Sequence, residues 1–149
     1  MSTSQAWPRR FPTTIAARKV RFLYWLRRLF GLLPPVRWED GKVVDGATYA
    51  AIYAKVVARL RAYRPDLIQT PDFRLTVRIY DRWPAGSEYN WGRVLAPNTI
   101  PGDTGGTLCL ADFKAHDVPT IEHECVHAIT GIGSHPLELF KPDGYTLTF

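Results

Sequence analysis

Two histidines and a glutamate in this chain have the types and the spacing needed to hold a metal ion and to move a proton. They lie in the pentad His123-Glu124-Cys125-Val126-His127, which matches the pattern His-Glu-x-x-His. On a helix, a spacing of four residues places both imidazoles on one face, where their ring nitrogens can bind one Zn²⁺ at about 2.0 to 2.1 Å. Glu124 lies about 100° around the helix from His123, so it can reach a metal-bound water and act as a general base. The competing interpretation is a pair of structural histidines, satisfied within the fold.

A catalytic zinc site usually has three protein ligands and one open position, so a third ligand is needed. His135 is the first candidate, because Gly131 and Gly133 allow the backbone to leave the helix in a tight, left-handed conformation and to fold back toward the metal. The alternatives are Glu138, Asp143 and, less favoured, His116.

Hydrolysis at such a site also needs a donor for the negative charge that develops on the attacked oxygen. The side chains that can supply this donor are Tyr89, Arg93, His116 and Tyr145. The sequence does not rank them, so their positions relative to the histidines must decide.

The pentad must be carried by a helix, and its flanking residues predict one over Val118–Thr130. Asp117 can cap the start of this helix, Pro119 suits its first turn, and Gly131 and Gly133 end it. The apolar residues on the face opposite the metal are Ile121, Cys125, Val126 and Ile129. This face is expected to pack on a core while the histidines face a site.

The other elements that must position the helix are a second helix and a small sheet. Helical periodicity covers residues 48–63, and the alternation of apolar and polar residues over 73–82 is typical of a half-buried strand. The remaining segments are expected to be a hinge at 38–46, strands at 89–96 and 107–110, and an irregular loop at 97–106. The predicted fold class is α+β, with a small antiparallel or mixed sheet.

Length and composition fit one compact domain preceded by a basic arm. The chain has 149 residues, of which 46% are hydrophobic and 22% charged, and these values argue against collagen-like, disordered and multidomain chains. Its 2 cysteines cannot form a disulfide framework, and a reducing compartment fits this low count. Residues 1–37 carry eight basic and no acidic side chains, whereas residues 38–149 are net acidic despite an overall charge of +5. We therefore divide the chain into a basic arm, 1–37, and a body, 38–149.

The arm is expected to contain an amphipathic helix over residues 16–33. Arginines interrupt its apolar run, which argues against a membrane-spanning helix or a secretory signal, so a cytoplasmic location or a place within a larger assembly is expected. Its face suits a membrane surface, the phosphates of a nucleic acid or a partner protein, and an Arg-rich transit peptide has a similar composition. The simplest alternative is that Phe22, Trp25 and Leu29 pack against the body. The oligomeric state is left open.

The body resembles small zincin metallopeptidases. The similarity lies in Gly105-Gly106-Thr107-Leu108-Cys109-Leu110, in the segment from Val118 to Ile129, and in Gly133-Ser-His-Pro-Leu-Glu-Leu-Phe140, which is loosely similar to a segment of SprT-like metallopeptidases. The similarity covers about 45 residues. The spacing between His127 and His135 differs from the spacing of the second and third histidines in SprT-like proteins and in metzincins.

The resemblance implies a minimal zincin-like domain over 38–149 with a Zn²⁺ cofactor and a peptide or protein substrate. It implies that His123, His127 and His135 ligate the zinc and that Glu124 activates water. The strand that it expects to pair with an extended substrate consists of Thr107, Leu108, Cys109 and Leu110.

The expected function is therefore that of a zinc metallopeptidase. The alternative from another class is a structural or assembly protein, for example a virion or secretion-apparatus component, which retains a zincin scaffold and uses the arm as its anchor. A third hypothesis, a protease associated with nucleic acid, requires the arm to bind phosphate.

Overall fold

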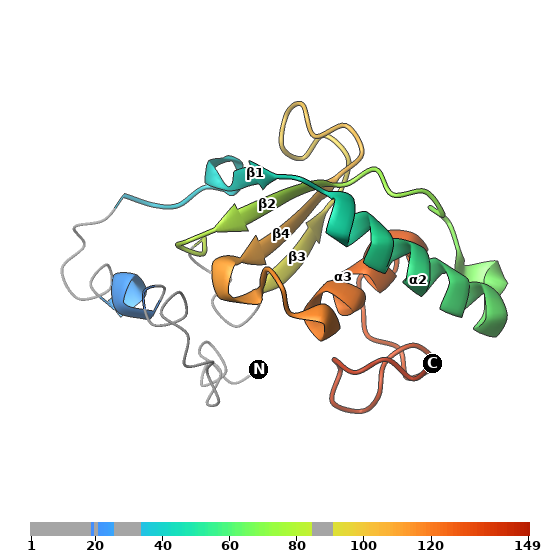
Figure 1. Ribbon diagram of the computed structural model, residues 1–149. Coiled ribbons are helices and arrows are strands. Elements are labelled where there is room, and N and C mark those ends of the chain that lie inside the picture. Colours follow the sequence, from blue (N-terminus) through green and yellow to red (C-terminus); the bar gives the residue numbers. More distant parts are fainter. Residues whose placement is uncertain (1–18, 20, 26–33, 85–90) are drawn as a thin grey trace.

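The computed structural model describes residue 19 and residues 21–25, 34–84 and 91–149 (Figure 1). Its helices are α2 (Ala47–Tyr63) and α3 (Val118–Thr130), with short 3-10 turns η2 (Trp38–Asp40), η3 (Pro65–Leu67) and η4 (Asp112–Lys114). Its strands are β1 (Lys42–Val44), β2 (Thr76–Tyr80), β3 (Gly92–Leu95) and β4 (Thr107–Ala111). The α+β class is thus confirmed, and the sheet is mixed.

The sheet has the strand order β1-β2-β4-β3, which places β4 in its interior. β4 pairs in parallel with β2 on one side and antiparallel with β3 on the other. The prediction that residues 107–110 form a strand is correct, but the substrate pairing that the resemblance implies needs a free strand edge, and β4 has none. Continuous burial along β4 is typical of a strand that is covered on both faces.

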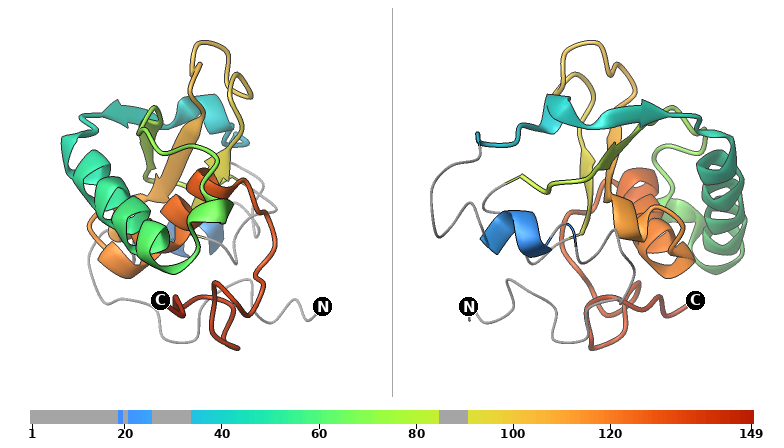
Figure 2. Two further views of the ribbon diagram at one scale, coloured as in Figure 1. Left: turned by 90° about the vertical axis from the view of Figure 1, so that its right-hand side faces the viewer. Right: turned by 60° about the vertical axis from the view of Figure 1, so that its left-hand side comes forward.

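Helices α2 and α3 lie side by side on one face of the sheet (Figures 1 and 2). Val56 and Leu60 of α2 and Ile121 and Ile129 of α3 are buried against Leu108 in the first core cluster. The face of α3 predicted to be apolar is therefore the face that packs in the core.

The opposite face of the sheet is covered by aromatic side chains. Tyr80, Trp83 and Trp91 are buried in a second core cluster, with Trp38 and Phe113 packed against it. Edge-to-face contacts join Trp38 to Tyr80 and to Trp83, with ring centroids 5.6 and 5.2 Å apart. Both faces of the sheet are thus covered, so β2 is not the half-buried strand that its alternation predicts.

The described part of the arm contacts this second cluster through Tyr24 and Val36. Residues 19 and 21–25 are helical, and the rest of the helix expected over 16–33 lies outside the described residues. Tyr24 is buried in the second cluster, whereas Phe22 and Trp25 are more than half exposed. The packing expected of Phe22 and Trp25 is therefore made by Tyr24. Within the described ranges, no helix has the length and apolar character needed to cross a membrane.

The segment expected to be a hinge, residues 38–46, contains ordered structure. η2 is followed by β1, whose residues pair antiparallel with β2 from Lys42 opposite Ile79 to Val44 opposite Val77. β1 is short and mostly exposed, so no apolar alternation marks it in the sequence. Its pairing with a strand more than thirty residues away makes it a strand.

A buried ion pair ties the long loop before β4 to the sheet. Arg78 of β2 donates to both carboxylate oxygens of Asp103, at 2.9 and 3.0 Å, and Thr107 donates to the same carboxylate at 2.7 Å. The two charged side chains are only 14% and 6% exposed. Arg78 also donates to the carbonyl oxygen of Gly41, at 3.0 Å, which joins the turn before β1 to the same network.

We expect Asp103→Ala to lower the free energy of unfolding by about 3 kcal/mol, because it leaves the buried Arg78 guanidinium without its counter-charge. The matched control is Asp72→Ala, which removes a carboxylate 3.9 Å from Arg74 in a pair that is more than 70% exposed. This control should change the unfolding free energy by less than about 0.5 kcal/mol. Urea denaturation measures both, and equal effects of the two substitutions would contradict the structural role of the buried pair.

Candidate metal centre

Helix α3 has the bounds predicted from its sequence, and local signals set both ends. The Asp117 side chain accepts from the backbone N–H of Thr120 at 3.2 Å, and Pro119 lies in the first turn. Gly131 ends the helix with φ 71°, in the left-handed conformation that glycine adopts without a steric penalty. The chain then turns back, so that residue 135 lies beside the metal-facing side of the helix.

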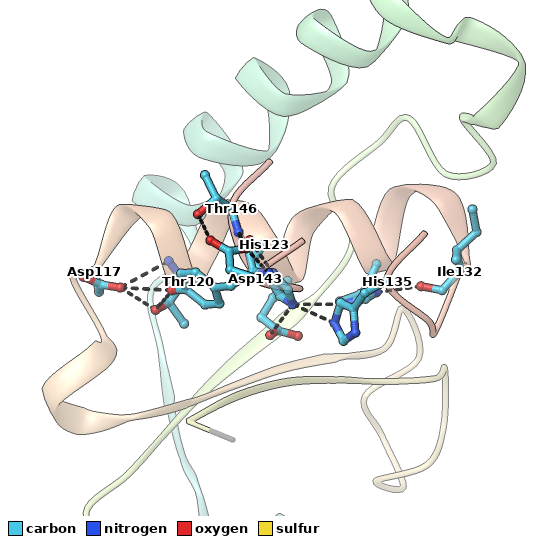
Figure 3. A network of polar contacts seen from close by, with 10 residues as sticks. Asp117, Thr120, His123, Ile132, His135, Asp143 and Thr146 are labelled. Carbon is cyan, nitrogen blue, oxygen red and sulfur yellow. Dashed lines mark hydrogen bonds and ion pairs between the residues drawn. The ribbon is translucent and has the colours of Figure 1, made fainter. Parts of the chain in front are cut away.

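Three histidines converge at one point, and two of them, His123 and His135, are labelled in Figure 3. The Nε2 atoms of His123 and His127 lie 3.1 Å apart, and the Nε2 atom of His135 lies 3.2 Å from each of them. Within the described part of the chain, these three residues make up the group of His, Cys, Asp and Glu side chains that is close enough to share a metal ion. The three histidines named from the sequence are thus brought together.

Backbone carbonyls fix the orientation of two of the rings. His123 Nδ1 lies 2.9 Å from the carbonyl oxygen of Tyr145, and His127 Nδ1 lies 2.6 Å from that of Ile132. Since a carbonyl oxygen only accepts, each Nδ1 carries the proton and donates. Burial lowers the pKa of both histidines, that of His123 to about 4, so both rings are neutral near pH 7. Their Nε2 atoms therefore present lone pairs to each other.

Two lone pairs at 3.1 Å repel unless a cation lies between them, so this arrangement fits a metal ion. Three nitrogens bound at 2.0 to 2.1 Å to a tetrahedral metal are about 3.3 to 3.4 Å apart, close to the observed spacing. The Nδ1–H bonds to backbone carbonyls are the outer contacts that metal-binding histidines usually make. The three histidines can hold a metal ion, and three nitrogen donors leave a fourth tetrahedral position open.

Glu124 lies beside this point and is enclosed by the sheet. Its Oε2 atom is 3.9 Å from His123 Nε2, and the residue is only 8% exposed. Gly92 of β3 lies directly over it: a Cβ atom at Gly92 would meet Glu124 Cγ at 3.0 Å and Oε2 at 3.2 Å. Burial raises the pKa of Glu124 to about 8, and the charge of Arg93 opposes the rise. The carboxyl group is thus held near the histidines at a place where β3 has no side chain.

Two aromatic residues outside the pentad complete the surroundings of the histidines. The buried Phe140 ring lies 4.7 to 5.2 Å from the ring centres of His123, His127 and His135. The Tyr145 ring stacks on His123 at 4.9 Å, and its hydroxyl contacts Thr120 Oγ1. Neither contact follows from local sequence, because both depend on how residues 136–146 fold back. The Phe at the end of the segment resembling metallopeptidases is the signal that points to Phe140.

The alternative third ligands lie elsewhere. Glu138 pairs with Arg64 at the end of α2, and Asp143 accepts from the backbone N–H groups of Tyr145 and Thr146. His116 lines a separate cavity, beside residues of β1 and α2. None of these three side chains joins the group formed by the described histidines.

The candidate oxyanion donors are likewise placed by the structure. The Arg93 guanidinium lies over the Trp38 ring, 5.4 Å from its centre, on the sheet face opposite α3. The Tyr145 hydroxyl is engaged with Thr120 and lies 3.4 Å from an Asp117 oxygen. His116 lines the separate cavity, and Tyr89 lies outside the described residues. Arg93 thus packs on Trp38 while its charge still reaches Glu124, and His116 belongs to a different cavity.

The strand expected to bind substrate is corrected. Thr107, Leu108, Cys109 and Leu110 are each 0% exposed, and both edges of β4 are paired. No backbone group of these residues is available to an added strand. β3 is the strand beside the histidines that lies at the end of the sheet order, so within the described residues no strand pairs with its outer edge.

The two cysteines are buried on opposite faces of the sheet. Cys109 belongs to the aromatic cluster and Cys125 to the helical one, and they form no disulfide. Burial raises the pKa of both thiols to about 12. The interpretation of Cys125 as a small buried apolar residue is confirmed.

Comparisons with known proteins do not place the chain in a class. Scans against protein-family models, curated proteins and solved structures each found no match. The function must therefore be argued from the site itself.

Proposed function

We propose that the chain is a zinc-dependent metallopeptidase with a minimal zincin-like body. The observation that carries the proposal is the convergence of three imidazole Nε2 atoms within 3.2 Å, next to the buried carboxyl group of Glu124. Three nitrogen donors with an open position are typical of catalytic zinc, whereas structural zinc sites are usually closed by four protein ligands. A site that only stabilised the fold would not need a carboxyl group beside the open position.

A zinc ion at such a site polarises a carbonyl group and makes water a better nucleophile near neutral pH. Side chains of the protein supply the metal ligands and the proton transfers. His123, His127 and His135 would hold the ion, and Glu124 in its ionised form takes a proton from water as the C–O bond forms. Glu124 then passes the proton to the leaving nitrogen as the C–N bond breaks, so that one water is consumed per peptide bond.

The substrate is proposed to bind along β3 in place of β4. β3 lies at the end of the strand order, and within the described residues no strand pairs with its outer edge. An extended peptide can add to such an edge through backbone hydrogen bonds. Because Gly92 lies over Glu124, this edge passes the carboxyl group without a side chain in between.

The proposal is tested by incubating the zinc-loaded full chain with a reduced and carboxymethylated protein and identifying new termini by mass spectrometry. We expect cleavage that a chelator abolishes and that added zinc restores. Absence of cleavage by zinc-loaded chain would contradict the peptidase and favour the assembly protein with a metal-stabilised scaffold.

Gly92 provides a further test, because a methyl group there would press on Glu124 Cγ and Thr120 Cγ2, each at 3.0 Å. We expect Gly92→Ala to reduce kcat by about tenfold through misplacement of the general base, with zinc affinity unchanged. The control is Val43→Ala, at an exposed position of β1 at the opposite end of the strand order, which should leave kcat unchanged. Unchanged kcat in Gly92→Ala would show that β3 does not position Glu124.

A further inference from the structure

A cavity of about 360 Å³ adjoins His127 at the end where β3 and α3 both finish. His127 forms part of its wall, and apolar side chains from several elements form most of the rest. The apolar residues around it include Tyr53, Leu75, Val94, Leu95, Ala96 and Ile132. Its volume is at the lower end of the range for ligand pockets, which suits one large side chain better than a whole cofactor.

The cavity has a defined place along the proposed substrate strand. Gly92, at the start of β3, lies over Glu124 and Thr120 in the first half of α3. Residues 94–97, at the end of β3, share the cavity wall with His127 and with residues 131–133 after α3. β3 and α3 therefore run in the same direction, and the cavity lies beyond Glu124 toward the C-terminal end of both.

This direction decides which half of a substrate meets the cavity. β3 already pairs antiparallel with β4, and antiparallel pairing is slightly the more stable per residue. A peptide that adds antiparallel to the free edge of β3 has its N-terminal half next to the C-terminal end of β3. That half lies at the cavity, and its C-terminal half lies toward Gly92.

We propose that this cavity receives a large apolar side chain from the N-terminal side of the bond to be cleaved, and so selects the substrate. The inference rests on the proposed function. His127 belongs both to the cavity wall and to the three converging histidines, and the mostly apolar lining favours Phe, Leu or Met over polar side chains. Specificity then lies before the cleaved bond.

The test uses two probes that bind zinc through a hydroxamate and carry their side chain on the N-terminal side. These are N-acetylphenylalanine hydroxamate and N-acetylglycine hydroxamate, titrated calorimetrically into zinc-loaded full chain. We expect the phenylalanine compound to bind at least about tenfold more tightly, the range that one apolar group gains in a hydrophobic pocket. Binding does not depend on turnover.

Substitutions at the cavity and away from it test whether the cavity causes the preference for the phenylalanine compound. Ala96→Trp places an indole at the cavity wall from an exposed position and should remove the preference, as should Gly133→Phe, where added atoms meet open space. Ala54→Trp, at an exposed position of α2 away from the cavity, is the matched control and should retain it. Because each variant is compared with both probes, a change in zinc affinity alone leaves the ratio unaffected.

The outcomes separate the two proposals. Failure to take up zinc would overturn the proposed function and this inference together. Zinc uptake with equal affinity for the two probes, or a preference that survives both cavity variants, would overturn only the inference. The cleavage sites mapped in the carboxymethylated protein give a second measurement. Enrichment of large apolar residues after the cleaved bond, rather than before it, would also contradict the inference about the cavity.

Discussion

Glu124→Gln is expected to reduce peptide hydrolysis by about 10³-fold while the protein still binds one zinc ion, since general acid–base groups contribute about 10² to 10⁴. The amide cannot take a proton from water, yet it has nearly the size of the carboxyl group and fits the same space beneath Gly92. Metal binding is retained because the ligands are nitrogen atoms of the three histidines, and Glu124 is not a ligand. Initial rates and zinc content are measured on the same preparations.

The matched control for this prediction is Glu122→Gln. Glu122 lies two residues away on α3, but it points toward α2, where it pairs with Arg59 at 3.2 Å. It should retain activity within about twofold, because partly exposed ion pairs contribute little. Full activity in Glu124→Gln would exclude Glu124 as the general base and with it the proposed mechanism.

His135→Ala is expected to weaken zinc binding by at least about 100-fold, since loss of a direct ligand costs more than the 10- to 100-fold typical of outer contacts. The substitution leaves two nitrogen donors on α3 and opens a second position at the metal. His135 is exposed and lies in a loop, so its removal should leave the fold of the metal-free protein intact. Competition with a chromophoric chelator measures the affinity.

His116→Ala is the control, because His116 is the histidine that lines the separate cavity. Its zinc affinity should equal that of the unaltered chain. Thermal unfolding gives a second measurement: zinc at 100 times its Kd should stabilise the chain and His116→Ala by about 2.7 kcal/mol, and His135→Ala much less. Equal zinc affinity in the two variants would contradict His135 as the third ligand and would favour Glu138 or Asp143 in its place.

Features set by local interactions could be predicted from the sequence. Both ends of α3 follow from short-range signals, the cap by Asp117 and the left-handed Gly131, and the structure has the same bounds. The same holds for the helical spacing that places His123 and His127 on one face. The turn back toward His135 begins at the left-handed Gly131, whereas Gly133, expected to share this conformation, has no positive φ, and the distance of His135 from the other histidines could not be derived.

Features set by pairing between distant segments could not be predicted. β1 is a strand because it pairs with β2, and its own residues are mostly exposed. The interior position of β4 depends on the strand order, which no residue of the segment encodes locally. One signal was present: Leu108, Cys109 and Leu110 form a continuous apolar run, which is typical of a parallel strand covered on both faces.

The surroundings of the metal centre depend on the last part of the described chain. The carbonyl of Tyr145 orients His123, and the Phe140 ring packs against all three histidines. Both contacts need the turn formed by residues 136–140 and the hydrogen bond between Lys141 and Thr146. Sequence spacing identifies candidate ligands, whereas tertiary folding decides which backbone groups orient them.

Zinc titration of the metal-free full chain, followed by X-ray absorption spectroscopy at the zinc edge, tests the metal centre most directly. We expect one ion per chain with nitrogen and oxygen neighbours at about 2.0 to 2.1 Å and the imidazole scattering of three histidines. His123→Ala should abolish this binding. Failure to bind zinc, or sulfur neighbours at about 2.3 Å, would contradict a centre built from His123, His127 and His135.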